Sequence, residues 1–84
     1  VLADGRVLLS YGYRKKPYGI RLRVLENALA DPDRAEEFVV RDDGVCADVG
    51  YPWAVQLADG SVLLAYYWTN PQGRRQILGS WLEI

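Results

Sequence analysis

The sequence predicts an all-β fold of about six antiparallel strands in two repeated units. Apolar runs rich in Val, Ile, Leu, Tyr and Trp alternate with short breaks that contain Gly, Pro or Asp, which is typical of strands and turns. Asp-Gly pairs separate apolar runs at two places, and one ten-residue segment occurs twice. With 84 residues, the chain forms one small domain at most.

The internal repeat is the strongest of these signals. Residues 2–11, Leu-Ala-Asp-Gly-Arg-Val-Leu-Leu-Ser-Tyr, return 55 positions later at 57–66, with eight of the ten residues identical. A shared Asp-Gly turn does not explain the flanking Leu-Ala and Val-Leu-Leu, so the match indicates two copies of one supersecondary unit. We therefore divide the chain into a partial unit at 1–43, a linker at 44–50 and a second partial unit at 51–84.

The turns and strands follow from local composition. Glycine adopts a positive φ without strain, so Asp4-Gly5 and Asp59-Gly60 each predict a type I′ turn. The predicted strands are Arg6–Arg14, Gly19–Glu26, Glu37–Arg41, Pro52–Leu57, Ser61–Thr69 and Arg75–Leu82. The breaks at 16–19, 42–44 and 70–73 carry Pro, Asp, Asn and Gly and mark the loops.

One short segment departs from the β pattern. Asp31 precedes Pro32, which is typical of an N-cap followed by proline at the first helical position. The run Glu37–Val40 returns to strand composition within a few residues. The segment therefore predicts a single short helical turn.

Several predicted strands are apolar on both faces, as in Val62–Trp68. A sheet with one face in water alternates polar and apolar residues, so these strands are expected to be covered on both sides. Six strands cannot cover themselves twice, whereas the blades of a β-propeller are each sandwiched between neighbours. The first unit lacks a strand before its Asp-Gly turn and the second lacks a fourth strand, which leaves strand edges for a partner to pair.

Composition excludes several functions. Ten basic residues against eleven acidic ones leave no cationic surplus for nucleic acid. No apolar run has the length of a membrane span. The chain has no histidine to act as a catalytic base for serine or cysteine, and Cys46 alone forms no internal disulfide or zinc site. We expect no metal and no cofactor.

The segments at 50–67, 11–21 and 41–44 carry a family resemblance. In the first, Gly-Tyr-Pro-Trp leads into a strand, an Asp-Gly turn and a second apolar strand that ends in Tyr. This pattern resembles the late part of sialidase (neuraminidase) superfamily six-bladed β-propellers, and the other two segments resemble BNR-repeat sialidase-like proteins. The resemblance implies that the chain supplies about a third of a propeller. It also implies binding or hydrolysis of sialic acid or another glycoside, in a secreted or periplasmic protein.

The resemblance assigns roles to individual residues. Tyr51 falls at the position of the family's tyrosine nucleophile, which a glutamate assists. Arg14 or Arg21 matches an arginine that pairs with the substrate carboxylate, and Tyr18 and Asp48 are further substrate-binding candidates. The Asp-box hairpin expected after Val24 is absent, and the remaining catalytic groups lie outside this chain. A single copy is therefore not expected to be an active enzyme.

Two hypotheses follow for function. In the first, the chain is a carbohydrate-directed module that is completed by missing blades or by self-association, where three copies would supply a six-fold ring. In the second, it is a non-catalytic β-rich structural or interaction protein. Under the second hypothesis Tyr51 is a strand-start aromatic that packs on Trp53, and the residues at 14–16 form a solvated loop.

Overall fold

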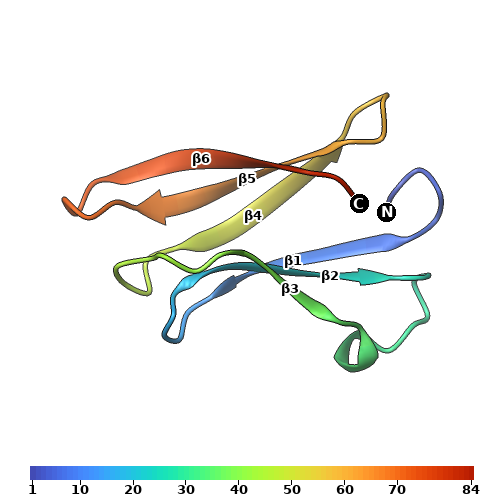
Figure 1. Ribbon diagram of the computed structural model, residues 1–84, viewed down its shortest axis with the longest axis horizontal. Helices are drawn as coiled ribbons and strands as arrows, with labels where there is room; N and C mark the ends of the chain where they lie inside the picture. Colours follow the sequence, from blue (N-terminus) through green and yellow to red (C-terminus); the bar gives the residue numbers. More distant parts are fainter.

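The computed structural model describes residues 1–84 and contains six strands in two antiparallel three-stranded sheets (Figure 1). The strands are β1 (Val7–Tyr13), β2 (Gly19–Leu25), β3 (Glu37–Arg41), β4 (Gly50–Gln56), β5 (Val62–Thr69) and β6 (Arg75–Leu82). The sheet orders β1-β2-β3 and β4-β5-β6 follow the chain, so neighbouring strands in each sheet are consecutive in sequence. The prediction of an all-β fold with two three-stranded units is confirmed.

The element boundaries agree closely with the sequence analysis. Strands β3 and β6 begin and end where they were predicted, while β4 begins earlier, at Gly50. The predicted helical turn is a 3-10 turn, η1 (Pro32–Arg34), and the Asp31 side chain accepts a hydrogen bond from the Asp33 amide. No helix in the chain has the length and hydropathy needed to cross a membrane.

The prediction of type I′ turns is wrong. Gly60 has φ +90° and its amide donates to the Leu57 carbonyl at 2.9 Å, but Asp59 does not have a positive φ. Gly5 repeats this conformation with φ +92°. Both are three-residue loops in which a type I turn is followed by a left-handed glycine. The Asp59 carboxylate accepts a hydrogen bond from the Ser61 amide, and this local bond favours the right-handed conformation at the aspartate.

The hydrophobic core lies between the two sheets. Ile20 of β2 and Val49 of the β3–β4 connection pack against Leu64, Tyr66 and Trp68 of β5, and all five side chains are buried. Partly buried side chains from β3 and β6 surround this cluster, namely Val40, Leu78 and Leu82. Each sheet therefore contributes one face to a shared core.

The opposite face of the second sheet is apolar and uncovered. Along β5 the buried residues alternate with half-buried ones, so Leu63, Ala65 and Tyr67 point away from the core. Trp53 lies opposite Ala65, and Ile77 lies opposite Tyr67, in the strand register. We call this surface the exposed apolar face; it comprises Trp53, Val55, Leu63, Ala65, Tyr67, Ile77 and Trp81. The sequence predicted that strands such as Val62–Trp68 are covered on both faces, and in the structure only the inner face of β5 is covered.

The two sheets come into backbone contact at a pair of glycines. A Cβ atom added to Gly12 of β1 would lie 2.8 Å from the Gly50 Cα and 3.2 Å from the Val49 carbonyl oxygen. These are backbone atoms, which cannot rotate away as a side chain does. The absence of a side chain at Gly12 therefore allows β1 to contact β4.

We expect Gly12→Ala to lower the free energy of unfolding by ~1–3 kcal/mol, because it forces two backbones apart. Gly79→Ala is the matched control, since its added Cβ would meet mainly the flexible Leu63 Cδ1 at 3.3 Å. It should change the free energy by less than about 0.5 kcal/mol. Urea unfolding of both variants measures the difference, and equal effects would contradict the role assigned to the glycine contact.

Candidate functional site

Three connections meet at one end of the molecule, on the left in Figure 1. We call this the loop end; it consists of residues 14–18, 42–49 and 70–74 with the adjoining strand ends. The Gly44 amide donates to the Tyr18 carbonyl at 2.9 Å, and Arg75 Nε donates to Asp48 Oδ2 at 2.8 Å. Loops from both sheets are therefore held together at the end where β1 stops and β4 starts.

The backbone at Tyr51 is unusual. Tyr51 has φ +49° and is the one non-glycine residue with a positive φ. It follows Gly50, at φ +128°, within a register irregularity that extends to Trp53. A left-handed tyrosine costs free energy, and such strain is often found at binding or catalytic sites. The conformation leaves the Tyr51 side chain 73% exposed.

Arg14 lies over this tyrosine. Its guanidinium carbon is 5.0 Å from the centre of the Tyr51 ring, within cation–π range, and its Nε donates to the Val49 carbonyl at 3.2 Å. No acidic side chain lies within ion-pair distance of Arg14. The Arg14 guanidinium therefore keeps N–H groups that are free to donate hydrogen bonds to a bound anion.

Asp48 is committed to bonds within the loop end. Its Oδ2 accepts from Arg75 Nε at 2.8 Å and from the Tyr67 hydroxyl at 3.3 Å, while its carbonyl accepts from Thr69 Oγ1 at 2.8 Å. The hydrogen bond to Asp48 raises the pKa of Arg75. The Tyr67 ring in turn meets the Tyr51 ring edge to face, with centres 6.2 Å apart. Asp48 thus supports Tyr51 through Tyr67 and does not contact its hydroxyl.

The other two predicted binding residues lie elsewhere. Arg21 stacks on Tyr13 at 3.4 Å from the ring centre, and its Nη1 donates to Glu37 Oε1 at 2.7 Å. Arg21 is thereby held on the first sheet, whereas Arg14 reaches across to the second. Tyr18 is half-buried against the core. Of the two arginines the sequence left open, Arg14 is the one beside Tyr51.

Sequence reasoning missed a tyrosine–glutamate pair on the outer face of the first sheet. The Tyr11 hydroxyl donates to Glu37 Oε2 and accepts from Arg23 Nε at 3.1 Å. Burial, and then the bond to Glu37, raise the pKa of Tyr11; the bonds from Tyr11 and then Arg21 lower the pKa of Glu37. Arg21 and Arg23 hold this pair on the first sheet, so the cluster joins β1, β2 and β3.

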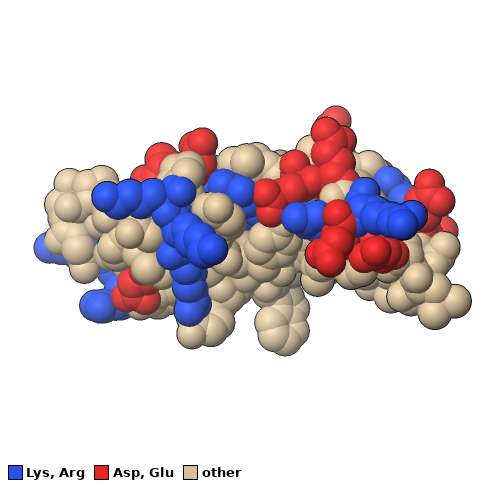
Figure 2. Space-filling view, turned by 90° about the horizontal axis from the view of Figure 1, so that it is seen from below, with Lys and Arg blue, Asp and Glu red and all other residues tan.

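Basic side chains gather at the loop end. They are Arg14, Lys15, Lys16, Arg41, Arg74 and Arg75. Arg41 pairs with Asp43 at 2.7 Å and Arg75 with Asp48, which leaves the others without an ion pair. On the face drawn in Figure 2, blue atoms dominate the left end and most red atoms lie right of centre. The end that carries Tyr51 is thus the one suited to an anion.

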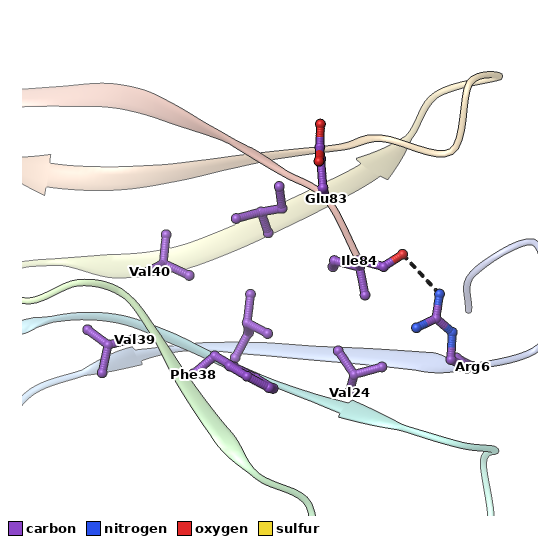
Figure 3. Close-up of a pocket in the computed structure, with 9 residues that line it drawn as sticks. Arg6, Val24, Phe38, Val39, Val40, Glu83 and Ile84 are labelled. Carbon is purple, nitrogen blue, oxygen red and sulfur yellow. Dashed lines mark hydrogen bonds between the residues drawn. The ribbon is translucent and has the colours of Figure 1, made fainter.

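A groove of about 400 Å³ opens between the sheets, away from Tyr51. Figure 3 draws the residues that line it, among them Val24, Phe38 and Val40 of the first sheet and Ile84, which follows β6. Arg6 Nη2 donates to the Ile84 carbonyl at 3.1 Å at its border. The lining is mainly aliphatic and aromatic, and its charged groups are those of Arg6 and Glu83.

No group of three or more Cys, Asp or Glu side chains is arranged to hold a metal ion. No protein-family model matches the chain, and no curated protein matches it. A crystal structure of a protein of unknown function from Dyadobacter fermentans is similar, with a TM-score of 0.92 and 55% identity over 99% of this chain. The chain spans 23% of the length of that protein.

We expect Glu37→Gln to flatten the dependence of stability on pH. The lowered pKa of Glu37 means that its ionised form is favoured in the folded state. That contribution is present above the ordinary carboxyl pKa and is lost as the pH falls through the lowered one. Between about pH 5 and pH 3 the wild type should therefore lose more stability than the variant.

Urea unfolding over this pH range measures the effect. Glu36→Gln is the control, because Glu36 is exposed and forms no ion pair. Parallel pH profiles for the wild type and Glu37→Gln would contradict the stabilising role of the cluster.

Proposed function

We propose that the chain is part of a sialidase-like β-propeller whose loop end binds an acidic sugar. One observation carries the proposal. The exposed, left-handed Tyr51 lies 5.0 Å from the guanidinium of Arg14, which has no carboxylate partner within the chain. A sugar carboxylate is the partner whose planar geometry and charge match a free guanidinium.

The surroundings of Arg14 favour an anionic ligand. Lys15, Lys16 and Arg74 form no ion pairs and lie in the same group of loops. Unpaired positive charges gathered at one end raise the local concentration of anions and speed their encounter. The Tyr51 ring provides an apolar surface for the sugar itself. A neutral sugar gains only the contact with the Tyr51 ring and not the attraction to the positive charges.

The propeller part of the proposal is supported by length. This chain covers 23% of the similar Dyadobacter protein, so that protein is about four times as long. With a repeat of 55 residues, it has room for about six such units, within the range of blade numbers that propellers adopt. The two sheets described above would then be neighbouring blades.

Hydrolysis needs more than the loop end provides. A tyrosine nucleophile requires a carboxylate base at its hydroxyl and a second acid for the leaving group. Asp48 bonds to Tyr67 and Arg75, and Glu37 bonds to Tyr11 on another surface. The proposed activity of this chain is therefore binding, and turnover would depend on carboxylates from other units.

The second candidate function is that of a non-catalytic interaction protein. The exposed apolar face favours it, because Trp53, Ile77 and Trp81 present large side chains to solvent on one surface of the second sheet. Contiguous apolar surfaces of this kind often mark sites of protein association. The two candidate surfaces adjoin at Tyr51 and Tyr67, but they depend on different residues and are tested separately.

We expect Arg14→Gln to weaken binding of an α-methyl sialoside by about tenfold or more, since a charge-assisted pair to a carboxylate is removed. Calorimetric titration of the protein with the sialoside measures this effect. Arg34→Gln is the matched control, because Arg34 is exposed in η1, distant in the fold from the loop end. It should leave the affinity unchanged.

Titration with neutral methyl galactoside completes the experiment. The neutral sugar should bind more weakly than the sialoside and should respond little to Arg14→Gln. Equal affinity for the two sugars, no binding of the sialoside, or equal losses in Arg14→Gln and Arg34→Gln would each refute the proposal.

A further inference from the structure

The repeat makes the two sheets comparable residue by residue. Val7 pairs with Leu25 in the first sheet and Val62 pairs with Leu82 in the second, so β1 corresponds to β5 and β2 to β6. This register makes Ile77 the equivalent of Ile20. By the same register, Gly79 and Trp81 are the equivalents of Leu22 and Val24.

Equivalent residues differ sharply in burial. Ile20 is 0% exposed in the core, whereas Ile77 is 72% exposed. Leu22 is buried and Val24 is half-buried, whereas Trp81 is 66% exposed. The first sheet thus buries the face that carries Ile20 and Leu22 against the second sheet. The second sheet leaves the equivalent face, which carries Ile77 and Trp81, in solvent.

The surface that covers the first sheet is also known. It is the row of Leu64, Tyr66 and Trp68 on β5. The equivalents of this row in the first unit are Leu9, Tyr11 and Tyr13 on β1. Their side chains lie on the outer face of the first sheet, away from the core, where Leu9 is exposed and the two tyrosines are half-buried. The chain therefore has an uncovered face, the exposed apolar face. It also has an uncovered copy of the row that packs on the equivalent face of the first sheet.

We propose that a second copy of this chain docks head to tail, with its row of Leu9, Tyr11 and Tyr13 on the exposed apolar face of the first copy. The contact repeats the interface between the two sheets within one chain. The occupant is a second copy because both halves of the contact are present and unfilled on the same molecule. Such an association is heterologous, and three copies related in this way would close a ring of six sheets.

The charges beside the row are compatible with this contact. Arg21 and Arg23 share one carboxylate, that of Glu37, so the cluster keeps a net charge of +1, and both guanidinium groups are held by hydrogen bonds within the first sheet. The internal interface contains an arginine as well, with the Arg41 guanidinium 3.9 Å from the centre of the Trp68 ring. An arginine stacked on an aromatic ring is therefore already part of how these sheets pack.

Two surface variants test the geometry. Ile77→Lys places a charge on the exposed apolar face, and Leu9→Lys places one on the row of Leu9, Tyr11 and Tyr13. Each variant alone should lose self-association in sedimentation velocity while its circular dichroism stays that of the wild type. Mixed in equal amounts, the two variants should form a heterodimer. The Ile77→Lys variant keeps its row of Leu9, Tyr11 and Tyr13, and the Leu9→Lys variant keeps its exposed apolar face.

The remaining outcomes overturn the proposal. A wild type that stays monomeric up to millimolar concentration excludes it. If Ile77→Lys abolishes association and Leu9→Lys does not, the exposed apolar faces meet each other symmetrically. Val39→Lys, on the outer face of the first sheet, replaces Leu9→Lys if that variant fails to fold. Leu29→Lys, almost fully exposed in the β2–β3 connection, is the control and should associate as the wild type does.

Discussion

The packing of β5 against the first sheet is the interaction on which the rest of this structure depends. Leu64, Tyr66 and Trp68 meet Ile20 and Val49 there, and this cluster is the hydrophobic core between the sheets. Each fully buried side chain of this size contributes roughly 1.5–3 kcal/mol. A chain of 84 residues without a disulfide has few other sources of stability. The relative placement of the sheets, and with it the loop end, is therefore set by this contact.

The same contact determines which side chains meet at the loop end. It brings β1 against β4 at Gly12 and Gly50, where two backbones touch. Arg14 continues from β1 on the side that faces the second sheet and so reaches Val49 and Tyr51. Arg21 is held on the first sheet by Tyr13 and Glu37. The alternation of side chains along a strand, once the core face is fixed, decides between two arginines that are equivalent in sequence terms.

Local sequence predicted the strands and the helical turn because their causes are local. Strand composition, Asp31 before Pro32 and the Asp-Gly pairs each act within a few residues. The turn type was missed because the Asp59 side chain bonds to the following backbone, which favours a right-handed aspartate over the type I′ conformation. Tyr11 and Glu37 meet only through the register of three strands. The strain at Tyr51 depends on a local irregularity in strand pairing, which composition does not reveal.

The two-sided apolarity of β5 remains the strongest link between sequence and function. A strand with one face in water tolerates polar residues there, yet Val62–Trp68 contains no charged side chain on either face. One face is accounted for by the core, and the other consists of Leu63, Ala65 and Tyr67 on the exposed apolar face. In the repeat, this second face has the same position as the covered face of the first sheet. If a further sheet of the same kind packs on it, the face is apolar for that reason, and it lies in solvent when the chain is alone. A ligand at the loop end would then lie beside the junction of adjacent units, since Tyr67 belongs to the exposed apolar face and also contacts Tyr51.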